Sequence, residues 1–449
     1  MKKCLLIAAA IATTLCASAE NKIYYFDESL DGTVFGVSSN GLYAVGGDEA
    51  DNIGFVWRSD KPEEITRLEN CVCRDASNNG TIVGSMYLTG TYTSLAAYYD
   101  GSEWHRLPLS DNIIGESFAM SISSDGKYIG GYQYTYYKDS ETGGRYYPCL
   151  WTRDDFGDYQ LKIYNDIELP DHQGFAVGAV SEDGRVLAGQ VFCGFGSLIP
   201  ALLVDGKFVI FNELETRSEP FYYKGQLLGY YNEYYIDGFH DYSSTDNFYG
   251  SFLSIDDAGN IYGMRTKAND VKEDGTGVLT YGGCKYNYKS GEWTDHSYGS
   301  RGSAYMCGFN GNYISMNNGN IIVDGTEQDL LTYFGITGFD RQVSGLAAFS
   351  SDGTVAGGTS LYYLEASGEY AGQPFFLKLD GLSGVNDIAA ETSAPGVIVN
   401  GNQIVVTGAD NIAVYNAMGQ LMSTGSVSSQ RPGVYIVRAD NKTVKVVVK

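Results

Sequence analysis

Short stretches of alternating hydrophobic and polar residues, each interrupted by a glycine-containing turn, recur along the first 380 residues of the chain. A period of two is typical of half-buried β-strands, and two such runs joined by Asn-Gly or Asp-Gly predict a β-hairpin. One phrase stands at seven places: GVSSNGLYAVGG at 36–47, DASNNGTIVGS at 75–85, SISSDGKYIGG at 121–131, AVSEDGRVLAGQ at 179–190, SIDDAGNIYGM at 254–264, a degenerate GFNGNYIS at 308–315, and AAFSSDGTVAGG at 347–358. The pattern predicts a repetitive body made of β-strands.

Each copy of the phrase carries a turn glycine, which adopts at little cost the positive φ of a tight two-residue turn. The clear copies place it at Gly41, Gly80, Gly126, Gly184, Gly259 and Gly353, and the degenerate copy places it at Gly311. We interpret the aspartates before these glycines (Asp125, Asp183, Asp352) as turn residues rather than calcium ligands. A second glycine follows a few residues later, where another backbone can approach closely.

A second phrase follows most copies, again with Asp-Gly or Ser-Gly at a hairpin tip. It reads GFVWR at 54–58, LAAYYDGSEW at 95–104, PCLW at 148–151, PALLVDGKF at 200–208, GCKYNYKSGEW at 283–293 and PFFLKLDG at 374–381. Two hairpins per repeat give four antiparallel strands, and a repeat of about fifty residues with four strands is typical of a propeller blade. The fold class predicted for 20–382 is therefore all-β, a six- or seven-bladed β-propeller, because the degenerate copy leaves the number open.

The two phrases together resemble the HAF-type extracellular repeat of bacterial propeller-like proteins. The shared pattern is A-x-S-x-D-G-x-x-x-x-G, a spacer, and then Ala or Pro before F-x-W, and it covers about 35–380. The resemblance implies a propeller and no particular activity.

The last 55 residues have their own alternation and their own turns. Hydrophobic positions predict short strands near 397–399, 403–407, 411–416, 420–424, 433–438 and 443–448. Short antiparallel strands over this length predict a small β-sandwich at 395–449. Residues 383–394 form the linker that separates it from the body.

This tail resembles the type A sorting domain of the type IX secretion system. The matching residues lie in VYNAMGQ, PGVYIV and the closing KVVVK: Val414, Tyr415, Gly419, Gly433, Val434, Tyr435, Lys445 and Lys449. The usual L-x-x-G-x-Y lead-in is weakened, since Ser428, Ser429, Gln430 and Arg431 precede Gly433 without a leucine. The resemblance implies that the partner of 395–449 is the type IX machinery, and that the body becomes secreted or held at the outer-membrane surface. The alternative is an adhesive sandwich without a sorting role.

The first 19 residues read MKKCLLIAAAIATTLCASA, which predicts a signal peptide at 1–19. Two lysines precede an apolar run too short to cross a bilayer, and a small-x-small site follows before Glu20. Cys16 raises the alternative of a lipid anchor, but Leu15 stands where a lipobox has a small residue. No later stretch is long and apolar enough to predict a transmembrane segment.

The formal net charge of −24 argues against nucleic acid as a partner, because that binding depends on Lys and Arg contacts to phosphate. Residues 395–449 hold five basic and two acidic residues, a net +3, while the part between signal and tail holds 23 basic and 52 acidic residues, a net −29. The break in charge supports the domain boundary. Six cysteines remain after the signal, and we expect buried thiols with at most one disulfide: Cys71, Cys73, Cys149, Cys193, Cys284 and Cys307.

Catalytic and cofactor motifs give no assignment. The four histidines (His105, His172, His240, His296) lie in no metal-binding spacing, and no GxSxG elbow, phosphate loop or dinucleotide fingerprint occurs. We therefore expect no metal and no cofactor, and we assign no catalytic residue. With 52 acidic residues in the body, composition alone cannot select a carboxylate pair for glycoside hydrolysis.

The clearest functional signal is aromatic. Residues 221–249 contain eleven Phe and Tyr residues within the longest interval between repeats, and 132–147 is a smaller case. Tyrosine suits stacking on sugars or contact with proteins, so we name as binding candidates Tyr222, Tyr223, Tyr230, Tyr231, Tyr234, Tyr235, Tyr136 and Tyr137. The alternative is that these rings pack along extended strands. The function predicted is non-catalytic binding of a surface glycan or protein; the alternatives are an enzyme that acts on polysaccharide in the propeller funnel and a structural surface-layer component.

Overall fold

The computed structural model describes two compact units, 1–381 and 382–449, which are treated separately below. The described residues are 21–25, 32–88, 93–111, 115–135, 145–164, 172–193, 197–240, 248–271, 277–295, 303–339, 341–364, 369–379, 396–400, 403–407, 411–416, 420–425, 427–429, 431, 433–439 and 442–448. The predicted signal peptide and linker, 1–19 and 383–394, lie outside these residues.

In the first unit, each copy of the repeated phrase begins a four-stranded antiparallel sheet, whose strands pair in sequence order. One sheet holds β2 (Thr33–Val37), β3 (Tyr43–Asp48), β4 (Ile53–Arg58) and β5 (Ile65–Glu69); the next holds β6 (Cys71–Ala76), β7 (Ile82–Tyr87), β8 (Ser94–Tyr99) and β9 (Trp104–Arg106). An eight-stranded sheet combines β10 (Gly115–Ile122), β11 (Tyr128–Thr135), β12 (Arg145–Arg153) and β13 (Tyr159–Ile163) with β14 (His172–Val180), β15 (Val186–Cys193), β16 (Ser197–Val204) and β17 (Lys207–Ile210). Its halves are four-stranded sets joined by one parallel pairing, Tyr146 with Gly174.

The remaining sheets of this unit follow the same plan. They are β21 (Ser251–Ile255), β22 (Asn260–Val271), β23 (Gly277–Asn287) and β24 (Glu292–Asp295); then β25 (Tyr305–Phe309), β26 (Tyr313–Met316), β27 (Asn320–Val323) and β28 (Thr326–Asp329); and last β29 (Gln342–Phe349), β30 (Val355–Leu364) and β31 (Glu369–Lys378) with β1 (Lys22–Tyr25) as the outer strand. The degenerate phrase around Gly311 thus lies in a complete sheet. The single short helix of the described residues is α1 (Leu330–Tyr333).

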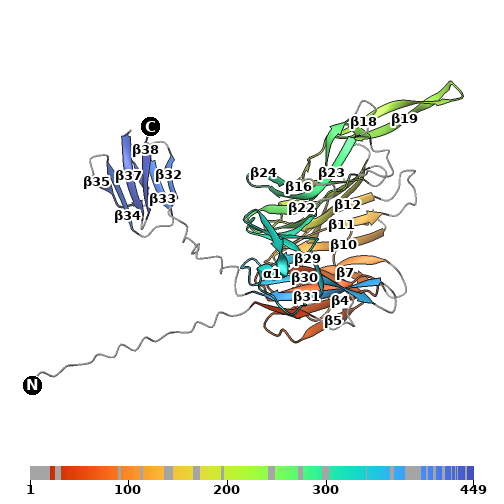
Figure 1. Ribbon diagram of the computed structural model, residues 1–449, viewed down its shortest axis with the longest axis horizontal. Coiled ribbons are helices and arrows are strands. Elements are labelled where there is room, and N and C mark those ends of the chain that lie inside the picture. Colours follow the sequence, from red (N-terminus) through yellow and green to blue (C-terminus); the bar gives the residue numbers. More distant parts are fainter. Residues whose placement is uncertain are drawn as a thin grey trace, which may run out of the picture. The chain divides into compact units, whose positions relative to one another are not determined.

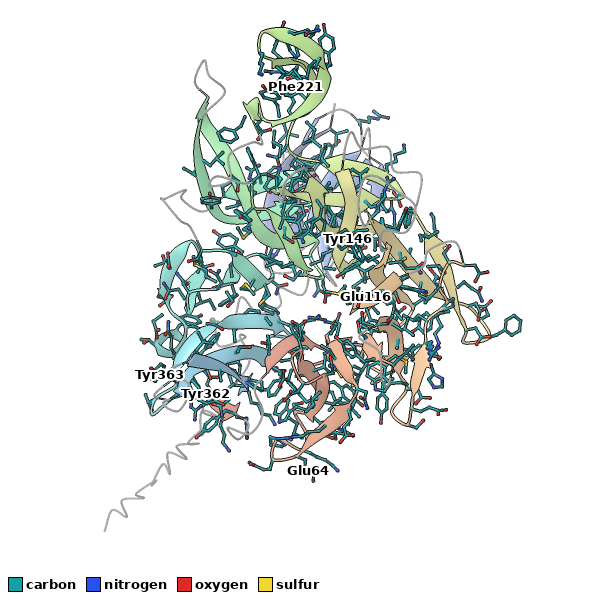
Figure 2. The ribbon with its side chains drawn as sticks, turned by 90° about the vertical axis from the view of Figure 1, so that its right-hand side faces the viewer. Glu64, Glu116, Tyr146, Phe221, Tyr362 and Tyr363 are labelled. Atoms are coloured by element: carbon teal, nitrogen blue, oxygen red, sulfur yellow. The ribbon has the colours of Figure 1, made fainter. Side chains whose placement is uncertain are left out.

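The sheets follow one another around a ring, which Figure 1 shows from the side and Figure 2 shows along its axis. The first strand of each sheet contacts the first strand of the next, and β29 of the last sheet contacts β2 of the first. Strand β1 joins the two ends of the unit because it pairs with β31, from Lys22 opposite Lys378 to Tyr25 opposite Phe375. The predicted all-β fold and its β-propeller architecture are confirmed.

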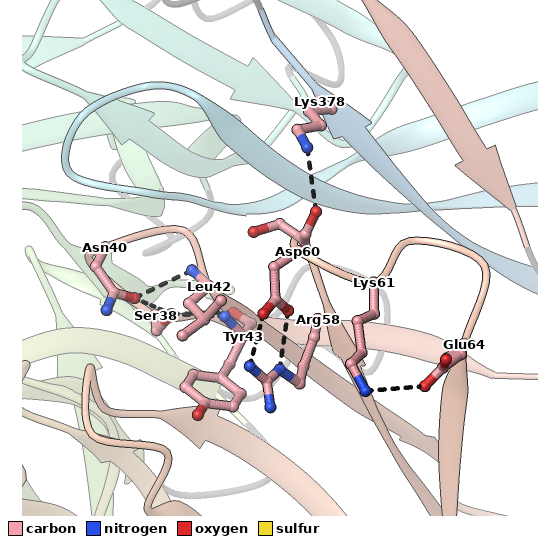
Figure 3. Close-up of polar contacts among 10 residues, drawn as sticks. Ser38, Asn40, Leu42, Tyr43, Arg58, Asp60, Lys61, Glu64 and Lys378 are labelled. Carbon is pink, nitrogen blue, oxygen red and sulfur yellow. Dashed lines mark hydrogen bonds and ion pairs between the residues drawn. The ribbon is translucent and has the colours of Figure 1, made fainter.

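Five of the six clear copies form a serine-centred turn, and in the copy around Gly259 Asp256 takes the place of the serine. The expected two-residue turn is therefore wrong for the clear copies. Only the glycine has a positive φ there; the degenerate copy differs, since both Asn310 and Gly311 have one. In the first sheet the buried Ser38 hydroxyl donates to Asn40 Oδ1 over 2.8 Å and accepts the Tyr43 N–H over 2.9 Å (Figure 3). Equivalent Ser-to-Asp bonds of 2.7 Å occur at Ser123, Ser181 and Ser350.

The residue after the turn serine links several turns to their neighbours in the ring. The Ser351 N–H donates to the Ser39 carbonyl over 2.8 Å, the Asn78 N–H donates to the Ser124 carbonyl over 2.8 Å, and the Ser124 hydroxyl donates to Glu182 over 2.6 Å. The phrase recurs because it supplies both a turn and a bond between sheets.

The second glycine of the phrase lies against the backbone of the neighbouring inner strand, as predicted. A Cβ at Gly46, Gly84, Gly131 or Gly189 would lie 2.0 Å from a carbonyl oxygen of that strand. At Gly131 this oxygen belongs to Phe118. Such an approach leaves no room for any side chain.

Large side chains of the second phrase fill the space between sheets. Trp57 is fully buried and stacks on Phe376 of the last sheet, with ring centroids 4.3 Å apart, and its indole N–H donates to the Pro62 carbonyl. Trp151 occupies the same place between two later sheets and donates to the Pro108 carbonyl. The six cysteines named above are buried free thiols.

The ring has two unlike ends, because antiparallel strands alternate in direction. Connections from first to second strand lie at what we call the turn end, and they span three to five residues, from 310–312 to 38–42. Connections from second to third strand, and from each sheet to the next, lie at the opposite loop end. Among them are the connection from β11 to β12 and the long interval from β17 to β21. Variable, long connections on a rigid scaffold are typical of a functional face.

The second unit contains two antiparallel sheets that share one core. One holds β32 (Gly396–Asn400), β33 (Gln403–Thr407) and β36 (Val427–Ser429); the other holds β35 (Leu421–Ser423), β34 (Ile412–Asn416), β37 (Gly433–Ala439) and β38 (Lys442–Val448). Ile404 and Val406 from the first sheet pack with Val414, Val437 and their neighbours from the second.

Candidate functional site

An aromatic arm projects from the loop end of the ring between β17 and β21. It consists of β18 (Leu214–Tyr223), β19 (Gln226–Ile236) and the short β20 (Phe239–His240). Its base is fixed, because Ile236 and Phe239 are buried in the core of the neighbouring sheet. Its outer half lies well outside the ring, as the position of Phe221 shows (Figure 2).

The outer half of the arm exposes large apolar side chains to solvent. They are Phe221, Tyr222, Tyr223, Leu227, Leu228 and Tyr230, and Tyr230 is 68% exposed. The pairing register places Tyr222 and Tyr230 on one face of the hairpin and Phe221 on the other. Phe221 lies opposite Gly229, so no cross-strand side chain covers its ring.

The other predicted tyrosines are placed differently. Tyr235 is half-buried at the base of the arm, where the Arg217 guanidinium lies 3.8 Å from its ring centroid. The backbones of Tyr231 and Tyr234 belong to β19, but their side chains lie outside the described part, as do Tyr136 and Tyr137 entirely. The exposed candidates are therefore Tyr222, Tyr223 and Tyr230.

A channel runs along the middle of the ring, and the sequence analysis did not identify its lining. Each first strand has a β-bulge at the same point of the phrase, which leaves one residue unpaired per sheet: Phe35, Arg74, Met120, Gly178, Leu253, Met306 and Ala347. Six of these also border the channel cavities. A bulge shifts the alternation by one residue, so a simple period of two in the sequence does not show which residues line the channel.

Arg74 is the only charged residue in this set of bulge positions. Its side chain is 16% exposed, and its guanidinium carbon lies 4.3 Å from the ring centroid of Phe35. One of its nitrogens, Nη2, donates to Glu49 Oε1, and Glu49 is itself 58% exposed. The Nε atom is buried and has no hydrogen-bond partner among the described residues.

At the loop end of the channel, Arg74 borders a cavity of about 300 Å³. Phe35, Met120, Tyr132 and Gln190 also line it. Burial raises the pKa of Tyr132 to about 12, despite the opposing effect of Arg74, so its hydroxyl stays protonated near neutral pH. Next to it the rings of Tyr146 and Phe192 stack 4.2 Å apart, and Figure 2 shows Tyr146 and Glu116 near the middle of the ring.

Asp75 follows Arg74 and is half-buried. Its carboxylate accepts bonds from Ala76 N, Ile122 N and the Ser121 hydroxyl, at 2.8, 2.9 and 3.1 Å. Burial raises its pKa to about 7, although these bonds act against that shift. Because its oxygens are already occupied by two adjacent sheets, the arrangement favours a structural role. The described residues include no group of three side chains able to hold a metal ion.

In the second unit, the residues of the sorting motif divide between core and surface. Val414 and Tyr435 are buried, and the Tyr435 hydroxyl donates to the Arg431 carbonyl over 2.9 Å. Tyr415 and Gly433 are half-buried, and Val434 is exposed. Gly419 and Lys449 lie outside the described residues, as does the side chain of Lys445.

Comparison with known proteins gives fold likeness alone. No protein-family model matches the chain, and no curated protein matches its sequence. Among solved structures, the chain is similar to a catalytically inactive virginiamycin B lyase from Staphylococcus aureus with quinupristin (13% identity, TM-score 0.35, covering 80% of this chain and 100% of that one). It is also similar to a luciferin-regenerating enzyme (11%, 0.34, 80% and 95%) and to an ancestral GH74 enzyme (10%, 0.32, 92% and 51%). In the part of the chain that the structure describes, no helix is long and apolar enough to cross a membrane.

Proposed function

We propose that this protein is an exported, seven-bladed β-propeller that binds a glycan through the aromatic arm at its loop end. Counting the two halves of the eight-stranded sheet separately, the ring of described strands has seven four-stranded sets. Each would be one blade. Particle averages viewed along the ring axis should then show seven blades, and six would contradict the count.

The observation that carries the binding proposal is the exposure of six large apolar side chains on one narrow hairpin. A two-stranded hairpin has little core of its own, so these side chains add nothing to the stability of the ring. Contiguous exposed apolar surface of this kind is typical of interaction sites. Rings with a free face and a hydroxyl at the edge suit a sugar better than a dry protein interface.

The test is a glycan-array screen of the mature chain, followed by calorimetric titration of Tyr222→Ala and Tyr230→Ala. Each change should weaken binding by about 1–3 kcal/mol, by analogy with base stacking on aromatic side chains. The melting temperature should change little because both rings are exposed. Tyr363→Ala is the matched control, since Tyr363 is 55% exposed on β30, away from the arm. Unchanged affinity in both arm variants, or binding of a protein but of no glycan, would contradict the proposal.

We further propose that 395–449 directs the protein to the type IX route. Supporting features are the three motif segments in order, the separate core of the second unit, and the contrast between +3 here and −29 in the body. Deleting 395–449 should leave the protein in the periplasm of a type IX-competent host. Fusing 384–449 to an inert cargo with a signal peptide should bring that cargo to the surface. Surface delivery of the truncated protein would indicate an adhesive tail instead.

A further inference from the structure

The cavity at the loop end of the channel has an incomplete set of polar partners. Arg74 offers five N–H groups, and among the described residues one of them, on Nη2, donates to a single Glu49 oxygen. Its Nε is buried without an acceptor. A buried donor without a partner costs free energy, so a structural arginine would normally be better satisfied.

The other polar groups of this cavity are also available. Neither the Tyr132 hydroxyl nor the Gln190 amide forms a hydrogen bond to another described residue, although both line the same cavity as Arg74. The phenol, protonated near neutral pH, can donate, and the amide can both donate and accept. The cavity of about 300 Å³ is at the lower limit for small-molecule sites, which suits one sugar ring.

From this arrangement we infer that Arg74 binds the carboxylate of an acidic sugar, a uronic acid unit, whose ring lies against Phe35 and Tyr132. This inference rests on the proposed glycan binding and specifies the class of glycan. The Nε–Nη2 edge of a guanidinium matches the two oxygens of a carboxylate, and Glu49 contributes only one oxygen to it. In the unbound protein, the Glu49 carboxylate then occupies the place of the ligand carboxylate on Arg74. The ligand displaces this exposed side chain when it binds.

The negative charge of the body explains why binding of an acidic sugar would depend on this one site. With a net charge of −24 over the chain, the protein repels anions at long range. An anionic sugar therefore binds only where a local cation outweighs that repulsion. Arg74 meets this condition because its side chain is only 16% exposed, and salt screens an ionic contact less when it lies away from water. Without Arg74 the same cavity should no longer prefer the acidic sugar.

The test compares two ligands that differ only in the charged group, methyl galacturonoside and methyl galactoside, by calorimetric titration of the full mature chain. Wild type should bind the acid at least tenfold more tightly than the neutral glycoside. Arg74→Gln should abolish that preference by weakening binding of the acid at least tenfold. Arg74→Lys keeps the charge but loses the planar guanidinium that can donate two parallel hydrogen bonds to a carboxylate, so this variant should retain part of the preference for the acid. Glu49→Gln should tighten binding of the acid about threefold or more by removing the competing carboxylate.

Arg185→Gln is the matched control, since Arg185 also pairs with a carboxylate, Asp205, but at the turn end. Thermal melting of each variant checks the fold. If Arg74→Gln does not fold, Glu49→Gln still decides, because Glu49 is largely exposed. Equal affinity for acid and neutral glycosides in wild type, or no effect of Glu49→Gln on acid binding, overturns the inference. The proposed arm function would survive that outcome, provided that Tyr222→Ala and Tyr230→Ala still weaken glycan binding.

Discussion

Replacing Ser181 by alanine tests whether the repeated phrase is held together by its serine. Ser181 is buried, its hydroxyl donates to Asp183 Oδ1 over 2.7 Å, and it accepts the Val186 N–H over 3.0 Å. Alanine removes one oxygen and no apolar contact. The change therefore isolates the two hydrogen bonds.

The expected loss follows from those two bonds. The bond to Asp183 contributes about 0.5–1.5 kcal/mol, as a typical net hydrogen bond does. The Val186 N–H is buried, so leaving it without an acceptor costs about 1–3 kcal/mol more. We expect Ser181→Ala to lower the free energy of unfolding by about 1.5–4.5 kcal/mol, the sum of the two.

The assay is urea unfolding followed by tryptophan fluorescence, since Trp57 and Trp151 are fully buried between sheets of the ring. Ser102→Ala is the matched control: the Ser102 hydroxyl also donates to an aspartate, Asp100, over 2.7 Å, but in an exposed turn. That variant should change the unfolding free energy by less than about 0.5 kcal/mol. If Ser181→Ala is equally mild, the aspartate and glycine alone make the turn, and the serine-centred account is wrong.

Three further predictions concern the ring. Gly131→Ala should prevent stable folding, because its Cβ would lie 2.0 Å from the Phe118 carbonyl oxygen, whereas Gly229→Ala, with open space around it and no positive φ, should be mild; soluble yield and circular dichroism compare them. Tyr24→Ala should lower the melting temperature and speed proteolysis more than Tyr25→Ala, since Tyr24 packs on Trp57 where β1 closes the ring, while Tyr25 is 55% exposed. The pKa of Asp75, raised from 3.8 to about 7 by burial, means that the folded state favours the proton, so this residue's contribution to stability falls as pH rises from about 4 to about 7. The stability difference between wild type and Asp75→Asn should follow that slope across the same pH window, and a pH-independent difference would show that Asp75 titrates normally.

Local chemistry explains why much of the fold could be predicted from the sequence. In most copies the turn serine, the Asp or Asn two residues later and the glycine lie within a few residues of one another, so these copies form a pattern that can be recognised in the sequence. The second glycine was predictable for the same reason, as its neighbour is the strand across the hairpin. The strands of the tail follow the alternation closely, from β32 (Gly396–Asn400) to β38 (Lys442–Val448).

The candidate site was only half predictable. A cluster of tyrosines in an insertion indicated the arm, but exposure decides which of them can bind, and that depends on the register of β18 and β19. Arg74 gave no signal, because it looks like one more polar position on a strand. A bulge and the convergence of the inner strands turn that position toward the channel.

The sequence by itself determined most of the strands and the positions of the turns, since these arise from contacts between near neighbours in the chain, and its composition and charge indicated the two-part organisation and the aromatic insertion. The type of turn was decided by hydrogen bonds that only the structure shows. The tertiary structure decided which strands complete which sheet. Tyr24 and Phe376 pair although about 350 residues separate them, and the outer strand of the last sheet comes from the N-terminus. It also decided which side chains meet in the channel. Such contacts leave no pattern among neighbouring residues of the sequence, because their free energy comes from burial and pairing that exist only after the ring has closed.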